Sequence, residues 1–183
     1  MLKLSENPPI WSPGVNSILE LEGTWYVAHT KARNEKAFAW DLLRRDIGYF
    51  LPLYEKTTFS GGRRRRVLLP LFTSYVFFCG DEETRYIAMT TDRLAKAIRV
   101  PDQEGFLKEL RQIERALQGS AKLDPFPEVQ VGQRCRVKYG PYKGLEGEVI
   151  ERCGNTYVLL RVSFISRAAI MKIEPEALEP IPD

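Results

Sequence analysis

The fold is decided by the stretch Ser74-Tyr75-Val76-Phe77-Phe78-Cys79, an unbroken run of residues that favour β-strands. Further runs of this kind lie at residues 24–30, 49–54 and 94–100, and helical patterns lie between and after them at residues 35–46, 81–89 and 102–117. Strands and helices in this order predict an α+β domain in which helices pack on an antiparallel sheet.

The ends of the first two helices have their own signals. Asn34 and Asp81 are residues that cap helix amino termini, and Gly48 suits the left-handed position that follows a helix. We therefore expect the first helix to begin after Asn34 and to stop at Gly48.

The chain as a whole predicts two domains. Residues 1–23 lack periodicity and contain three prolines, which indicates a flexible leader, and residues 24–118 form the α+β domain. Residues 119–128 have the composition of a linker. Short strand-like runs separated by glycines then predict a small all-β barrel over residues 129–183.

Charge is distributed unevenly along the sequence. Residues 24–100 hold 14 lysines and arginines against 8 acidic residues, whereas residues 125–183 hold 8 of each. A basic first domain is typical of proteins that meet polyanions, although a solvated basic face that aids solubility explains the same numbers.

Two groups of cations stand out in the first domain. In the first helix, cations and one aromatic residue recur at steps of three and four, so they share one face. The second group follows Ser60-Gly61-Gly62, where a tight reversal is expected to project an arm into solvent. The members of the two groups are Arg33, Lys36, Trp40 and Arg44, and Arg63, Arg64, Arg65 and Arg66.

Several classes of function lack support in the sequence. His29 is the single histidine, and no nucleophile, phosphate-loop or dinucleotide motif is present, so we expect no catalytic residues, metal or cofactor. The three cysteines form no CxxC pair and read as reduced packing residues. No membrane span or secretion signal is recognisable, and we expect a soluble, cytoplasmic protein.

Two segments resemble a known family. Trp25-Tyr26-Val27 together with residues 70–78 is similar to the amino-terminal domain of the NusG family of transcription elongation factors. Residues 131–149 resemble the KOW motif of that family. The KOW residues carried over are Gly140, Pro141, Tyr142, Lys143, Gly144 and Gly147.

The resemblance implies a monomeric factor that binds the clamp helices of RNA polymerase and suppresses pausing or termination. An apolar depression would be built from six residues, and three more would make a polar contact across the polymerase cleft. The basic groups, joined by Lys31, would lie near upstream or non-template DNA or nascent RNA. The polymerase-binding residues are Trp25, Tyr49, Phe50, Pro52, Tyr75 and Phe77, with Thr84, Arg85 and Tyr86. The alternative for the ring residues is that all belong to the core.

The sequence also departs from the general factor. Residues 164–170 read Phe-Ile-Ser-Arg-Ala-Ala-Ile where general members carry a different pattern that helps bind the termination factor Rho and a ribosomal protein. This difference and the four arginines favour a specialised paralogue similar to RfaH, active at particular operons. The same difference puts both Rho and the ribosomal protein in doubt as partners. We keep the ribosome as a candidate partner of the KOW domain. An RNA- or ribosome-associated KOW protein is the alternative function.

Overall fold

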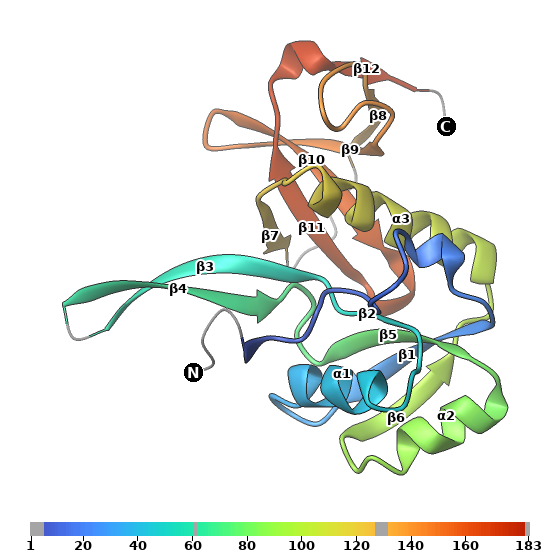
Figure 1. Cartoon of the computed structure of the whole chain (residues 1–183). Helices are drawn as coiled ribbons and strands as arrows, with labels where there is room; N and C mark the ends of the chain where they lie inside the picture. Colours follow the sequence, from blue (N-terminus) through green and yellow to red (C-terminus); the bar gives the residue numbers. More distant parts are fainter. Residues whose placement is uncertain (1–5, 61, 127–131, 182–183) are drawn as a thin grey trace. The chain divides into compact units, whose positions relative to one another are not determined.

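The structure is a computed structural model that describes residues 6–60, 62–126 and 132–181. The start of the predicted leader, Gly61 of the predicted reversal, the end of the predicted linker and residues 129–131 and 182–183 of the predicted barrel lie outside these residues. The chain divides into two compact units, Met1–Gln103 and Glu104–Asp183, which are described separately (Figure 1).

The first unit contains a four-stranded antiparallel sheet, two helices and a two-stranded ribbon. This confirms the predicted alternation of strands and helices and the antiparallel sheet. The strand order is β2-β5-β1-β6, and β3 pairs only with β4. The elements are β1 (Thr24–Thr30), α1 (Glu35–Leu43), β2 (Tyr49–Phe50), β3 (Leu53–Ser60), β4 (Arg63–Pro70), β5 (Tyr75–Gly80), α2 (Glu82–Met89) and β6 (Leu94–Arg99).

One face of this sheet packs against both helices. Tyr26 of β1 stacks on Phe78 of β5 with ring centroids 5.3 Å apart, and Phe38 of α1 meets Phe78 edge-on at 6.0 Å. Ala88 of α2 belongs to the same buried cluster. Because side chains alternate along a strand, Val76 and Phe78 point toward the helices while Tyr75 and Phe77 point to the opposite face.

Residues 6–23, the described part of the predicted flexible leader, are packed. A short 3-10 helix, η2, spans Ile18–Glu20, and the Ile18 side chain is fully buried. The Leu51 amide donates to the Ile10 carbonyl at 2.6 Å, and Trp11 forms a β-bridge with Phe50. The segment thereby supplies backbone partners to the outer side of β2, which no other strand of the sheet covers.

The end of α1 corrects the role assigned to Gly48. The left-handed residue after this helix is Asp46, at φ 56°, and Gly48 has no positive φ. A Cβ atom at Gly48 would lie 3.0 Å from a Leu21 methyl group and 3.2 Å from the Cys79 sulfur. A larger residue here would push against the Leu21 and Cys79 side chains, so glycine suits this position because of close packing, which the sequence pattern does not reveal.

The second unit contains helix α3 and a six-stranded antiparallel sheet in the order β12-β8-β9-β10-β11-β7. Strand β7 lies inside the predicted linker, where Leu123 and Phe126 are buried against the sheet. Pro125 is tolerated because β7 is an edge strand. The elements are α3 (Gln103–Gln118), β7 (Leu123–Phe126), β8 (Gln133–Val137), β9 (Glu146–Arg152), β10 (Asn155–Val162), η3 (Ser163–Ile165), β11 (Arg167–Lys172), η4 (Pro175–Ala177) and β12 (Leu178–Pro180).

Helix α3 belongs to this second unit from Glu104 onward, whereas the sequence placed it in the first domain. Two carboxylate oxygens of Glu109 accept hydrogen bonds from the Ser163 amide at 2.8 Å and hydroxyl at 2.5 Å. The ring of Phe106 meets Phe164 at 6.2 Å. These contacts join sequence positions more than 50 residues apart, and no local pattern predicts them.

Candidate functional site

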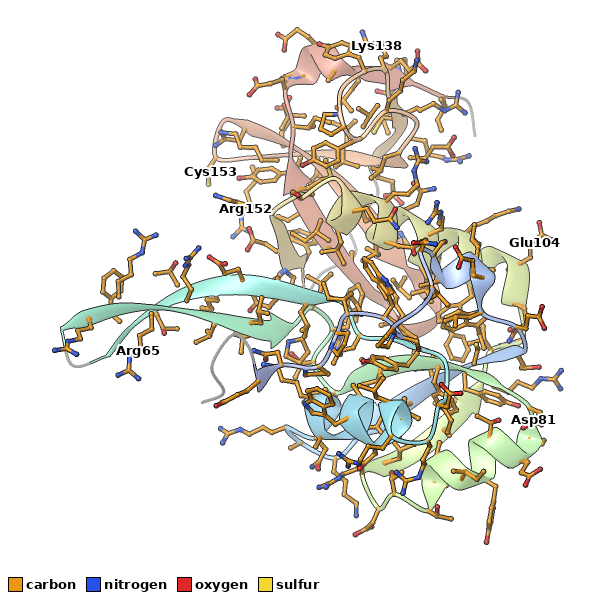
Figure 2. All side chains as sticks on the ribbon, in the orientation of Figure 1. Arg65, Asp81, Glu104, Lys138, Arg152 and Cys153 are labelled. Carbon is orange, nitrogen blue, oxygen red and sulfur yellow. The ribbon has the colours of Figure 1, made fainter. Side chains whose placement is uncertain are left out.

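The four arginines lie in an ordered β-ribbon. Strands β3 and β4 pair over their whole length, from Leu53 opposite Pro70 to Ser60 opposite Arg63. The ribbon extends away from the four-stranded sheet of its unit (Figure 1). The arginine side chains are exposed, and Figure 2 shows Arg65 directed away from the ribbon. We call the outer part of this ribbon, residues 57–60 and 62–66, the basic arm.

Little negative charge offsets the basic arm. Arg66 approaches Glu55 at 3.8 Å, and these side chains are 64% and 47% exposed, so the pair contributes little to stability. Within the described part of the chain, Arg63, Arg64 and Arg65 form no ion pair. Their guanidinium groups are therefore available to an external anion.

The predicted basic face of α1 is less uniform. The Lys36 ammonium donates to the Leu68 carbonyl at the base of the ribbon, and partial burial lowers its pKa. Lys31 pairs with Asp92 at 2.5 Å, and Arg44 pairs with Asp41. Lys36 thus has a structural role. Lys31 lies in an exposed pair, whereas the exposed Arg44 pairs with a carboxylate that is only 9% exposed.

The remaining members of this face differ in exposure. Arg33 is exposed, at φ 60°, just before α1, and Trp40 is half-buried within it. Asn34 occupies the cap position but makes no capping bond. Its side chain instead donates to the Ala32 carbonyl at 3.1 Å and accepts from Arg93 at 3.2 Å.

The predicted polymerase-binding rings fall on two different faces of the sheet. Tyr49 belongs to the core beneath the helices, and its hydroxyl donates to the Pro9 carbonyl at 2.9 Å. Burial raises its pKa. Tyr49 is therefore a core residue in this structure, because the alternation of β2 places it opposite to Phe50.

The rings on the other face are also covered. Trp25 is 3% exposed, and Phe50 and Phe77 are fully buried. Within the first unit, Trp11 lies 6.4 Å from Phe50, and Phe72 meets Phe77 at 6.0 Å. The predicted depression is thus not open at these rings in this conformation.

Tyr75 and Pro52 are the remaining two of the six residues predicted to form the apolar depression. Tyr75 is half-buried and lies 5.3 Å from the His29 ring, so it is the most accessible ring of the predicted six. Pro52 is buried, and its carbonyl accepts from the Leu71 amide at 2.9 Å.

The predicted polar contact lies in the first turns of α2. Asp81 caps this helix as predicted, because its carboxylate accepts from the Thr84 amide and hydroxyl, each at 2.7 Å. These hydrogen bonds lower the pKa of Asp81. Arg85 pairs with Glu82, whereas the Tyr86 side chain is 69% exposed. Tyr86 is accordingly the member best placed to meet a partner.

Of the predicted KOW residues, those at 140–144 lie in the turn between β8 and β9, and Gly147 lies in β9. Gly140 and Gly144 have φ of 82° and 76°, and the Gly144 amide donates to the Val137 carbonyl at 2.7 Å. A Cβ atom at Gly147 would lie 2.5 Å from the Leu159 carbonyl oxygen, so only glycine fits there.

This turn is held by an arginine that the sequence did not single out. The Arg115 guanidinium donates to the Gly144 carbonyl at 2.8 Å and to the Lys143 carbonyl at 2.5 Å. The atoms that Arg115 contacts are therefore main-chain oxygens. Arg115 lies in an ordinary helical pattern, and no sequence signal marks it.

The three cysteines differ in accessibility. Burial raises the pKa of both Cys79 and Cys135 to about 11. Cys153 is exposed in the turn between β9 and β10, at φ 51° (Figure 2). Among the described residues, no group of His, Cys, Asp and Glu side chains could hold a metal ion, and no helix is long and apolar enough to cross a membrane.

Comparison with known proteins bears on the first unit and the start of the second. One solved structure, the crystal structure of an MjSpt4:Spt5 complex in conformation B, is similar over 87% of this chain and 97% of that chain. The identity is 15% and the TM-score 0.26, values too low to carry an argument. No curated protein matches the sequence. The family described as transcription termination factor NusG matches residues 23–133. Because this match covers more than half of the sequence, the chain belongs to the NusG family of transcription factors.

Proposed function

We propose that this chain is a transcription elongation factor that travels with RNA polymerase and reduces pausing or termination. One observation carries the proposal: the region that matches the NusG family, residues 23–133, bears a ribbon with four exposed arginines. Such a ribbon gives a polymerase-bound factor a contact to the nucleic acid of the transcription complex.

The basic arm is the proposed contact to DNA or RNA. Alternate residues of a strand are about 6.6 Å apart on one face, so each face of β4 presents two guanidinium groups in a row. Cations arranged in this way bind phosphates without reading base sequence, and they release counterions on binding. Arg33, Lys31 and Arg44 would add weaker contacts, because Lys31 and Arg44 are already paired with Asp92 and Asp41.

The proposed polymerase contact combines α2 with the sheet face that carries Tyr75. Tyr86 and Tyr75 are accessible at present, and they would make the first contact with the clamp helices. Trp25, Phe50 and Phe77 would take part only after the groups that cover them, including Trp11 and Phe72, move. Replacing Phe77 with a charged residue would test folding rather than binding, because this side chain is fully buried.

The finer assignments extend the same proposal. We propose a KOW domain over residues 129–183, a specialised RfaH-type role at particular operons, a cytoplasmic location and a monomeric state. The ribosome is a candidate partner of this domain, and binding to Rho is not expected because residues 164–170 differ from the general factor.

The experiment is retention of the chain on RNA polymerase core after nuclease treatment. We expect retention, with a severalfold loss for a double variant Tyr75→Ala, Tyr86→Ala. Tyr139→Ala is the matched control, because Tyr139 is a 54% exposed ring in the second unit. Retention only on ribosomes or on RNA would overturn the proposal in favour of an RNA-associated KOW protein.

A further inference from the structure

An exposed aromatic ring lies within the basic arm. Phe59 is 78% exposed, more than any other large apolar side chain among the described residues. It occupies β3 next to Ser60, which pairs with Arg63 at the outer end of the ribbon. In the sequence, four adjacent arginines dominate this segment, and no local pattern marks Phe59 as a binding residue.

The register places this ring among guanidinium groups. Phe59 pairs directly with Arg64, so the two share one face, and Arg66 lies on that face two residues further along β4. Directly opposite residues have Cβ atoms about 5 Å apart, and diagonal neighbours are about 7 to 8 Å apart. A planar apolar surface is thus flanked by two cations at distances that a single nucleotide can span.

The requirements of folding do not explain this arrangement. Threonine occupies the two preceding positions of β3, and it supports a strand without an exposed ring. Single exposed apolar residues are common on protein surfaces, and arginines at an exposed ribbon discourage aggregation. These reasons explain exposed arginines alone or an exposed ring alone. They do not explain an exposed ring that lies beside arginines with no strong acidic partner.

We infer that the tip of the basic arm binds an unpaired base, with the Phe59 ring as the stacking surface and Arg64 and Arg66 on the flanking phosphates. Aromatic rings accept every base by stacking, and phosphate contacts add sequence-independent affinity. A base inside a continuous duplex has both faces covered by its neighbours, so the ring distinguishes single-stranded from duplex nucleic acid. The inference deepens the proposed function, on which it rests for the presence of an open strand.

The test uses the full chain and fluorescently labelled oligonucleotides, read by anisotropy. The probes are an oligothymidine of about 12 nucleotides and a mixed duplex of about 12 base pairs, which match the site sizes of single-strand binding proteins. The variants are Phe59→Ala, Phe59→Leu, Phe59→Trp and Arg64→Ser, with Tyr139→Ala as the control for loss of an exposed ring elsewhere.

We expect Phe59→Ala to weaken binding of the single strand roughly tenfold and binding of the duplex less than twofold, in line with the contribution of one stacked base. Phe59→Leu should behave like Phe59→Ala, because it keeps apolar area without a π-face, and Phe59→Trp should keep or improve the affinity. Arg64→Ser should weaken both probes and flatten their salt dependence.

Three results would overturn the inference. These are an unchanged affinity of Phe59→Ala for the single strand, an equal loss for both probes, and full rescue by Phe59→Leu. Binding to vesicles of phosphatidylserine and phosphatidylcholine that depends on Phe59, without binding to either oligonucleotide, would assign the ring to a membrane surface instead. Retention on polymerase is measured on the same variants, so failure here stays distinct from failure of the proposed function.

Discussion

Strands β4 and β5 follow one another in the chain and form for different reasons. The four central residues of β5, Val76 to Cys79, are all buried, so both of its faces are covered. The first four residues of β4 are exposed arginines, and burial begins only at Val67. Strand β5 is held by burial of apolar area, whereas the outer half of β4 is held by pairing with β3 alone.

This difference separates stability from function within one unit. Side chains of β5 are fixed by their packing neighbours, while those of the basic arm are free to change as long as the ribbon pairs. We therefore expect mutations in β5 to alter folding and mutations in the basic arm to alter binding.

The largest expected effect follows removal of a ring from β5. Phe78 is fully buried between Tyr26 and Phe38. Phe78→Ala should lower the free energy of unfolding by about 3 to 5 kcal/mol, because it leaves a cavity. Denaturant unfolding measures this, with Phe59→Ala as the matched control, for which we expect a change within about 0.5 kcal/mol. Similar losses for both variants would erase the distinction between the strands.

A second expected effect concerns the Cys79 thiol, also in β5. Burial raises its pKa to about 11. At pH 8 the higher pKa makes the thiolate fraction of Cys79 about a hundredfold smaller than that of an unburied cysteine. A chromogenic disulfide reagent at pH 8 should thus titrate one thiol, Cys153, in the native protein and three in denaturant. Rapid reaction of a double variant Cys135→Ser, Cys153→Ser under native conditions would show that β5 opens easily, because Cys79 is the one cysteine left in it.

The smallest expected effect on stability follows removal of the charge of the arm. Replacing Arg63, Arg64, Arg65 and Arg66 by serine should leave the thermal midpoint nearly unchanged, because these side chains are exposed and repel one another. The same variant should bind nucleic acid weakly and with a flatter salt dependence. Loss of cooperative unfolding would instead show that the arginines support the ribbon.

The sequence predicted the order of elements in the first unit because each signal is local. The run from Tyr75 to Cys79 contains only strand-forming residues, and the cap at Asp81 lies directly before its helix. The projection of the arm also followed from the repulsion of adjacent arginines. Local chemistry decides these features, so they could be read in advance.

The features that were missed depend on contacts between distant residues. Packing of Ile10 and Trp11 at β2 gives structure to a segment without periodicity, and pairing with β11 draws β7 out of the predicted linker. The accessibility of the rings in the predicted site likewise depends on tertiary packing. Phe59 had a local signal, because it is an aromatic residue beside a predicted glycine reversal. Its proposed role, however, depends on its pairing with Arg64, which only the strand register shows.

The hydrogen bonds from Arg115 to the turn between β8 and β9 have an evolutionary consequence. Since the guanidinium recognises the carbonyl oxygens of Lys143 and Gly144, the contact does not depend on which side chain stands at position 143. Divergence at that position is therefore tolerated without loosening the loop. The side chain at position 143 can thus change during evolution, to suit new partners, while Arg115 keeps its hydrogen bonds to the backbone.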